Sequence, residues 1–424
     1  MGEHACCGDR KRHRGGAGAA YHLSRRGAAV TVVDGGYPGE ATQAGAGIVC
    51  PWVDHPEDDD WYRLTREGAR HYPGLVEELG EDIGYAKVGA LLVAEDPVDL
   101  EPVRALLRRR YAGAPEMGEV VDVATPAELF PPLSDTLSAL LVPGAARVDG
   151  RSVRDALLAA AVARGAEVRT GTATLTQDGQ VLLHPADHPE TSAPPPLPPP
   201  APRPLRNGPP PGPAPPRRSR PGMPRGGRRR RFTLMRRRCP ASSKSPWVRG
   251  CRSRRTRSSW RPVRGRVRCA GRWASSCRSS PRRGQILHAT LEGVDTAWWP
   301  IILPRMGPYL LGFPDSRVVV GATVEDVGFA PRVTVGGLDE VIEAGLRVAP
   351  GLASATVSET RVGLRPVYAP GSALIGPVTD RVVVATGLSA YGLTAGPFTG
   401  ELAAALALGE RPPIDLAPYR PPTG

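Results

Sequence analysis

The chain has 424 residues, of which 55 are basic and 42 acidic, so its formal net charge is +13. All of this excess lies in one segment, because residues 191–283 contain 27 Lys and Arg and no Asp or Glu. The rest carries 28 basic against 42 acidic residues and reads as an ordinary acidic soluble protein, so the overall charge does not indicate a nucleic-acid-binding protein.

The first pattern that can be recognised along the chain is typical of the second half of a nucleotide-binding βαβ unit. Residues 17–34 read as a helix of small and apolar residues, a stop at Gly27, a β-branched strand and an acid, Asp34, at the strand end. In such a unit the helix N-terminus faces a pyrophosphate and the acid accepts the ribose hydroxyls. Residues 6–14 offer neither the apolar strand nor the glycine turn that should come first.

A shift of reading frame would supply the missing half. Codons compatible with residues 6–16, read one nucleotide later, permit V-V-V-I-G-S-G-I-V-G before the printed A-G-A-A-Y-H-L. Residues 271–281, read two nucleotides later, permit A-L-G-V-V-V-P-V-V-P. We interpret residues 1–16 and about 186–280 as out of frame; the alternative for the N-terminus is a genuine short basic tail.

Small residues dominate positions 41–48, which would let the backbone approach a flat ligand closely. A flexible loop would have the same composition. Apolar periodicity predicts helices over 59–80, 100–110 and 152–164. Strands are expected at 87–94 and 167–175. The strand that follows the third helix repeats the strand–helix–strand rhythm, which indicates a return to the nucleotide-binding domain.

The amino-acid composition of the sequence changes at about residue 186. Proline runs give way to arginine runs without helical or strand periodicity, so residues 186–280 are predicted to be disordered if they are translated as printed. A basic arm that binds nucleic acid is the functional alternative. Aromatic residues are sparse in this segment and no recognised nucleic-acid-binding fold surrounds it, so we expect no nucleic-acid partner.

Protein-like sequence returns at residue 284. Residues 309–311 and 317–323 are predicted to form paired strands around a turn at 314–316, and a helix is expected over 338–348. A strand at 382–385, a glycine-spaced loop at 387–397 and a helix at 399–408 follow. A strand, a glycine-rich turn and a helix in this order present backbone N–H groups to anionic or carbonyl ligand atoms.

Four motifs in the C-terminal half carry a resemblance. They are R-R-G-Q-I-L (282–287), V-V-V-G-A-T-V-E (318–325), G-L-R-P (363–366) and A-T-G-L-S-A-Y-G-L-T-A-G-P-F-T-G (385–400). With residues 15–180 they resemble FAD-dependent oxidoreductases of the D-amino-acid oxidase superfamily, close to glycine oxidases, sarcosine oxidases and D-amino-acid dehydrogenases.

The resemblance implies an α/β (α+β) fold in which a substrate domain is inserted into a Rossmann-like FAD-binding domain. The FAD-binding domain would comprise residues 1–50, 144–185 and 366–424. The substrate domain, an antiparallel sheet, would comprise 51–143 and 281–365, with 186–280 as a disordered or out-of-frame segment.

The resemblance also implies the contacts of the cofactor FAD, with the ribose on Asp34 and the adenine near Val168. The full set is Gly16, Gly18, Asp34, Thr42, Gln43, Ala44, Gly45, Gly47, Val168, Gly387, Leu388, Ser389, Tyr391, Gly392, Leu393 and Thr394. Arg365 would hold the substrate carboxylate, with help from Tyr309, because a guanidinium can bind a carboxylate through two hydrogen bonds. The alternative for an arginine is a surface ion pair, which is the role expected for Arg361.

The implied reaction removes a hydride from the carbon that bears an amine, and water hydrolyses the resulting imine. Small D-amino acids, glycine and N-methylglycine are open as substrates, and oxygen or a quinone as electron acceptor. No side-chain base is required if the amine binds neutral. The competing interpretations are a non-functional remnant of such an enzyme and a nucleic-acid-binding protein; the oligomeric state is open.

Cysteine use indicates the compartment. Of seven cysteines only Cys50 lies in protein-like sequence, and neither a disulfide framework nor a metal-ligand spacing is present. The sequence also lacks an N-terminal apolar signal and an apolar run long enough for a membrane span. We therefore expect a cytoplasmic protein without a transmembrane segment or a metal site.

Overall fold

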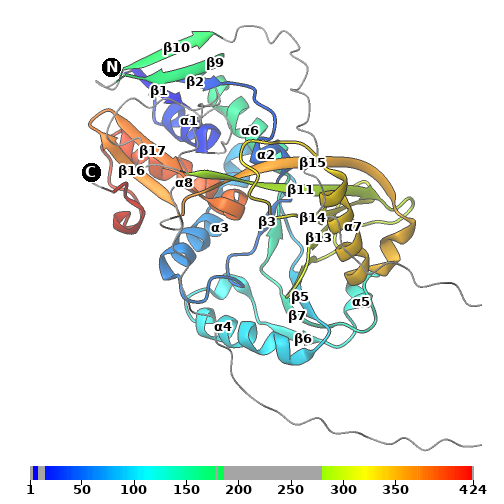
Figure 1. Cartoon of the computed structure of the whole chain (residues 1–424). Helices are drawn as coiled ribbons and strands as arrows, with labels where there is room; N and C mark the ends of the chain where they lie inside the picture. The colour runs from blue at the N-terminus through cyan, green and yellow to red at the C-terminus, as the bar shows by residue number, and fades with distance from the viewer. Residues whose placement is uncertain are drawn as a thin grey trace, which may run out of the picture. The chain divides into compact units, whose positions relative to one another are not determined.

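The computed structural model describes residues 3–7, 15–176, 180–185, 279–369, 371 and 373–422, all within one compact unit. They form a mixed α/β fold (Figure 1), as predicted. The predicted disorder of residues 186–280 falls outside the described residues, except at positions 279 and 280. No helix among the described residues combines the length and apolarity needed to cross a bilayer.

A four-stranded sheet in the order β1-β2-β9-β10 forms the Rossmann-like part (Figure 1). Its strands are β1 (Glu3–Cys7), β2 (Ala29–Asp34), β9 (Glu167–Leu175) and β10 (Val181–Pro185). The first three are parallel, and β10 runs antiparallel to β9. Helix α1 (Gly15–Arg25) lies between β1 and β2 in the chain, and α6 (Gly150–Ala163) precedes β9.

One expectation about the N-terminus is wrong. The sequence pattern predicts no strand over residues 6–14, yet Cys6 and Cys7 belong to β1 and lie opposite Val32 and Val33 of β2. The backbone N–H and C=O groups that make a ladder are the same in every residue except proline, so pairing with β2 overrides the poor strand pattern. The glycine turn expected after this strand lies outside the described residues.

The larger sheet has eight strands in the order β15-β11-β14-β13-β12-β5-β7-β6. They are β5 (Ala90–Ala94), β6 (Val121–Val123), β7 (Ser138–Val142), β11 (Ser280–Thr290), β12 (Ile301–Pro304), β13 (Tyr309–Phe313), β14 (Arg317–Gly321) and β15 (Thr356–Val367). Neighbours are antiparallel except β5 and β12, and the predicted hairpin of β13 and β14 is confirmed. How the two sheets divide into folding domains stays a prediction.

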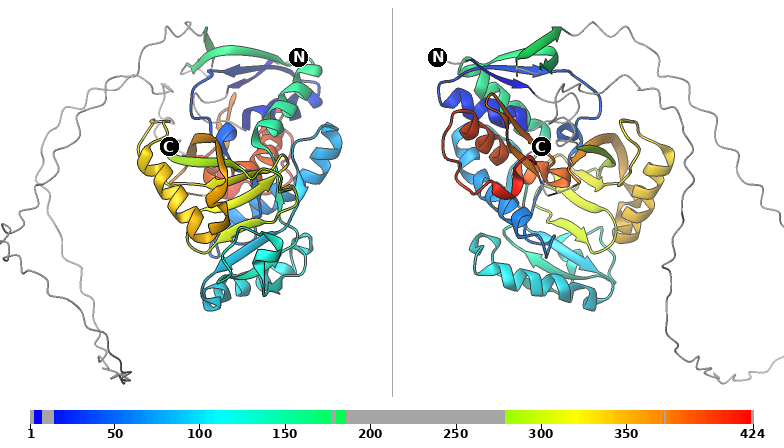
Figure 2. Two further views of the ribbon diagram at one scale, coloured as in Figure 1. Left: turned by 90° about the vertical axis from the view of Figure 1, so that its right-hand side faces the viewer. Right: turned by 60° about the vertical axis from the view of Figure 1, so that its left-hand side comes forward.

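The larger sheet is covered on both faces around β5. Leu91 and Val93 pack into one apolar cluster, whereas Ala90 and Leu92 pack into another, as the alternation of side chains along a strand requires. Helix α7 (Val335–Val348) packs against β11 and β14 (Figure 2). Helix α4 (Glu101–Tyr111) contributes to the opposite cluster through Val103 and Leu107.

Short elements complete the fold. They are α2 (Ala41–Ala44), α5 (Pro126–Leu129), the hairpin of β16 (Leu374–Thr379) with β17 (Val382–Thr386), and a small sheet in the order β3-β8-β4 of β3 (Ile48–Val49), β8 (Ala146–Arg147) and β4 (Ala86–Lys87). Helix α3 (Asp59–Leu79) starts at an Asp58 cap, whose carboxylate accepts the Trp61 N–H at 2.8 Å, and stops at Gly80 with φ +65°.

Helix α8 (Gly392–Ala407) starts seven residues before the predicted Thr399. The sequence indicated a loop to residue 397 because of its glycines and Pro397, which lacks the N–H that would bond to the carbonyl of Leu393. In the structure the hydroxyl of Tyr72, from α3, donates to that carbonyl instead. Packing against α1 and α3 therefore sustains a helix that local propensity disfavours.

Helices α1 and α8 approach each other through two glycines. A Cβ atom on Gly400 would lie 2.5 Å from the carbonyl carbon of Gly18, and one on Gly18 would lie 3.3 Å from the carbonyl oxygen of Pro397. Gly400 has no room for a side chain, and a side chain on Gly18 would require the backbone of α8 to shift by a few tenths of an ångström. The close crossing joins α1 of the Rossmann-like part to the C-terminal helix α8.

Candidate functional site

A pocket lies where α2 and its following loop, strands β11 and β15, and the start of α8 meet. Many of the residues predicted to contact cofactor or substrate line it. They are Thr42, Ala44, Gly45, Gly47, Tyr309, Arg365, Gly387, Leu388, Ser389, Gly392 and Leu393. Segments that are more than 300 positions apart in the sequence thus come together as the resemblance implied.

Glycine contacts hold these segments close. The N–H of Leu364 donates to the carbonyl of Gly39 at 2.9 Å, which docks β15 beside the chain that leads into α2. A Cβ atom on Gly363 would lie 2.9 Å from the Cβ of Ala44. Gly47 has φ +98°, and a Cβ there would be 1.9 Å from the carbonyl oxygen of Val148. The pocket wall is therefore backbone placed at short range.

Arg365 is the one charged residue among the described residues that line the pocket. Its Nη1 donates to the carbonyls of Thr323 at 3.0 Å and Arg283 at 3.3 Å, and within the described ranges it has no carboxylate partner. A Cβ atom on Gly284 would lie 2.5 Å from both Nη atoms, so the guanidinium lies over Gly284. An anchored cation without an acid is the complement of an anionic ligand.

A polar network supports the wall behind Arg365. The buried guanidinium of Arg283 donates through Nε to Glu325 at 3.1 Å, and Gln285 donates to the same carboxylate at 2.7 Å. The hydroxyl of Thr323 also donates to Glu325, at 2.7 Å. These bonds, with that from Arg283 the strongest, lower the pKa of Glu325 to about 2. The two residues whose carbonyls anchor Arg365 are thus themselves fixed.

The residues of the pocket fit the flavin end of FAD. Two lining hydroxyls, those of Thr386 and Thr399, are buried without a hydrogen-bond partner in the described part of the chain. A ligand with polar ring atoms would supply such partners. Gly392 opens α8 at the pocket, and the N-terminus of a helix favours carbonyl or anionic ligand atoms.

The remaining predicted cofactor residues lie elsewhere. Asp34 and Gln43 line a second cavity, which shares Ala44 with the first. The hydroxyl of Tyr391 donates to Asp54 at 2.7 Å, and that of Thr394 donates to the carbonyl of Ile48 at 3.0 Å, so neither side chain lines the pocket.

Three predicted contacts lie along the Rossmann-like part. Val168 on β9 is 49% exposed beside the end of β2, and Gly16 is half-buried in the first turn of α1. Gly18 lies where α1 crosses α8, and it faces the backbone of that helix. Binding of FAD by these three residues stays a prediction.

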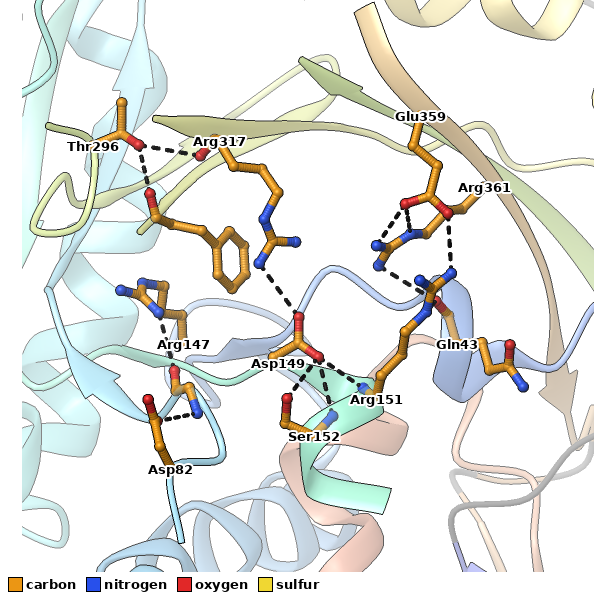
Figure 3. A network of polar contacts seen from close by, with 12 residues as sticks. Gln43, Asp82, Arg147, Asp149, Arg151, Ser152, Thr296, Arg317, Glu359 and Arg361 are labelled. Carbon is orange, nitrogen blue, oxygen red and sulfur yellow. Dashed lines mark hydrogen bonds and ion pairs between the residues drawn. The ribbon is translucent and has the colours of Figure 1, made fainter. Parts of the chain in front are cut away.

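A charged network joins the two parts of the fold beside the second cavity (Figure 3). Asp149 caps α6 by accepting the N–H groups of Arg151 and Ser152, and it pairs with Arg317 of β14 at 3.4 Å. Arg151 in turn pairs with Glu359 of β15 at 3.1 Å. Helix α6, which precedes β9 of the Rossmann-like sheet, is thereby tied to two strands of the larger sheet.

Arg361 belongs to this network, so its expected surface position is wrong. Its side chain is 12% exposed and pairs with Glu359 at 2.7 Å, and its Nη1 donates to the carbonyl of Gln43 at 3.5 Å. Arg361 lies four residues before Arg365 on β15, but α2 packs against this strand, and Arg151 of α6 pairs with the same Glu359. The strand pattern alone gives no sign of these helices.

Sequence reasoning missed some lining residues. Gly284, Thr386 and Thr399 were not named as site residues, although each falls within a motif that carried the resemblance. For Gly284 a signal existed, because a glycine inside an apolar strand often marks a close approach. The two threonines gave none, because only their missing partners distinguish them from ordinary buried hydroxyls.

The matches to known proteins cover most of the chain. The family described as "DAO: FAD dependent oxidoreductase" matches residues 15–189 and 236–406. An oxidoreductase of Bacillus subtilis is 34% identical over 426 residues, which cover 96% of this chain and 95% of the relative.

Solved structures agree with this match. The crystal structure of iminodiacetate oxidase from Chelativorans sp. BNC1 is 36% identical, with a TM-score of 0.73 and 98% of each chain covered. Glycine oxidase from Geobacillus kaustophilus shares the fold, with a TM-score of 0.65, 20% identity, and 100% of this chain and 98% of that chain covered.

Proposed function

Because this chain belongs to the DAO family of FAD-dependent oxidoreductases, we propose that it oxidises the carbon–nitrogen bond of a small amine that carries a carboxylate. Glycine, its N-substituted derivatives and small D-amino acids are the substrate class. The observation that carries the proposal is Arg365, an anchored cation whose pocket provides no acid among the described lining residues.

Arg365 would bind the substrate carboxylate and so fix the orientation of the neighbouring carbon. Because Nη1 is held by two carbonyls, the plane of the guanidinium is set before the substrate arrives. A preset plane reduces the rotamer entropy that binding must remove. Tyr309, which lines the same pocket, is the second candidate contact for that carboxylate.

When bound, FAD supplies the hydride acceptor. The chain places the start of α8, whose first-turn N–H groups can stabilise negative charge, at the same pocket. Ile48, Ile286 and Leu388 line it and exclude water from the reacting carbon. The described lining includes no Asp, Glu, His or Lys, so the amine must enter neutral, and the imine leaves to be hydrolysed by water.

The similarity to iminodiacetate oxidase is an argument for N-substituted glycines as the substrates of this protein within this class. Iminodiacetate is a secondary amine with two carboxylates, and 36% identity over nearly the whole chain supports a related preference in this protein. One lining arginine accounts for one carboxylate. We therefore place glycine, N-methylglycine and iminodiacetate first and D-alanine second. The cytoplasmic location and the choice of oxygen or a quinone as acceptor stay predictions.

Anaerobic reduction of the bound flavin tests the proposal. The purified FAD-loaded chain is mixed with each candidate amine, and bleaching of the flavin absorbance reports hydride transfer without dependence on the electron acceptor. Amines with a carboxylate should bleach the flavin, whereas 2-hydroxy acids and methylamine should not. Bleaching by hydroxy acids alone would refute amine oxidation, and equal bleaching by methylamine would refute carboxylate recognition.

A further inference from the structure

Two histidines and a glutamate meet where three helices pack together, and none of them lines the pocket described above. His22 comes from α1, His71 from α3 and Glu401 from α8. One ring nitrogen of each histidine and one carboxylate oxygen of Glu401 all lie within 4.8 Å of one another. The Nδ1 of His71 is 3.4 Å from Oε2 of Glu401.

Three of the four ring nitrogens of this group lack a hydrogen-bond partner among the described residues. His22 is 1% exposed, and neither of its nitrogens has a hydrogen-bond partner among the described residues; the same holds for Nε2 of His71. Buried polar groups in folded proteins are nearly always bonded, so an orphaned imidazole calls for an explanation. Burial disfavours the charged form of an imidazole, and a neutral ring has a lone pair available for a metal ion.

We propose that His22, His71 and Glu401 bind a divalent transition-metal ion, with zinc as the reference ion. Two imidazoles and one carboxylate form a donor set that zinc takes in proteins, with water in the fourth position. Bonds of about 2.0–2.1 Å in a tetrahedral site place donor atoms about 3.4 Å apart. The His71–Glu401 distance already has this value, and rotation of side chains within the 4.8 Å group would bring in His22.

The charges around the group are compatible with a cation. Arg26 lies 3.6 Å from Oε1 of Glu401, which is the oxygen that does not face His71, and it pairs more closely with Glu410 at 3.0 Å. Arg25 pairs with Glu78 at 2.7 Å. Each nearby arginine therefore has a further acid as its partner, and Arg26 can hold one oxygen of Glu401 while the other binds metal.

Such an ion would link the three helices. Helix α8 starts at the pocket and α1 follows the first strand of the Rossmann-like sheet, so the ion would stabilise the packing on which both depend. Metal that binds the folded chain alone raises its stability by mass action. The role is structural, because the group contributes nothing to the lining of the pocket.

Zinc titration of the FAD-loaded full chain tests the proposal. After chelator treatment and dialysis, calorimetry and elemental analysis should show one zinc per chain, and zinc should raise the thermal unfolding temperature while magnesium should not. His71→Gln and Glu401→Gln should each weaken zinc affinity by at least about 100-fold, above the 10–100-fold typical of changes outside the ligand set.

His288→Gln is the matched control. His288 is also buried, and neither ring nitrogen has a partner in the described chain, but its charged neighbours are chiefly arginines, among them Arg317 and Arg361. This variant should keep full zinc affinity. X-ray absorption of the zinc-loaded parent chain should show nitrogen and oxygen ligands without sulfur.

Three results would overturn the proposal. A folded parent chain that binds no zinc would do so whatever the variants show. Unchanged affinity in both ligand variants would place the ion elsewhere, as would sulfur ligation. A variant that fails to fold leaves the parent titration and the absorption spectrum to decide.

Discussion

Replacing Arg365 by alanine removes the one charged residue among the described lining of the pocket. If it binds the substrate carboxylate, the change should reduce transition-state stabilisation by about 2–5 kcal/mol, the range for one partner of a buried charge pair. At about 1.4 kcal/mol per tenfold, kcat/KM should fall by about 30-fold to about 4,000-fold. Arg365→Lys should restore only part, because an ammonium cannot form the paired hydrogen bonds.

The structure predicts a much smaller effect of the same change on stability. The carbonyl of Arg283 keeps its bond from the N–H of Glu325 at 3.0 Å, whereas that of Thr323 loses its 3.0 Å bond from Arg365. Loss of one such hydrogen bond amounts to about 1 kcal/mol. Flavin content should therefore stay at the parent level.

Stopped-flow reduction of the flavin by the best amine of the panel measures the effect, with flavin content and unfolding temperature recorded in parallel. Arg282→Ala is the matched control, because Arg282 lies opposite Arg365 in the β11–β15 ladder but pairs with Asp326 at 3.1 Å and does not line the pocket. Loss of flavin or of folding in Arg365→Ala, together with an unchanged rate for the remaining holoenzyme, would show that Arg365 is structural.

Three further changes follow from the packing and charges. Gly284→Ala should displace the guanidinium of Arg365, because the new Cβ would lie 2.5 Å from it. The change should reduce kcat/KM by about 100-fold while the flavin is retained. Gly336→Ala is the control and should leave the rate unchanged, because a Cβ there would have no atom within 4 Å. Gly400→Ala should destabilise the α1–α8 crossing by about 1–3 kcal/mol, measured by denaturant unfolding; an unchanged midpoint would contradict the crossing. The pKa of Glu325 falls from an ordinary 4.5 to about 2 on folding, so the stability that its carboxylate contributes is complete above pH 4.5 and is lost as the pH falls through 2. Glu325→Gln should therefore reduce the pH dependence of the free energy of unfolding in that interval. A variant whose free energy of unfolding changes with pH as steeply as that of the parent would refute the pairing with Arg283.

The sequence specified elements whose signals are local. Helix α3 is predicted to within one residue, because its apolar face repeats at helical spacing. Helix α8 is predicted to start seven residues too late, because the donor that satisfies the carbonyl of Leu393 is Tyr72, more than 300 positions earlier. No local pattern contains that hydrogen bond.

The site shows the same division. Motif resemblance brought Thr42, Arg365 and Gly387 to one pocket, because each motif carries its own spacing. The carbonyls that orient Arg365 belong to Arg283 within β11 and to Thr323 just after β14, and their positions depend on the sheet register. The group of His22, His71 and Glu401 has no spacing that a reader of the sequence could recognise, since each residue comes from a different helix.

The contact between Gly18 and Gly400 also affects how the protein is made. Helix α1 ends at Arg25 and α8 begins at Gly392, so about 370 residues emerge from the ribosome between them. At about 5–20 residues per second, α1 waits roughly 20–75 s before its partner exists. During this time its apolar face is available to chaperones and proteases. Nascent chains stalled before Gly392 should be cleaved within α1, whereas chains released after Ala407 should be protected.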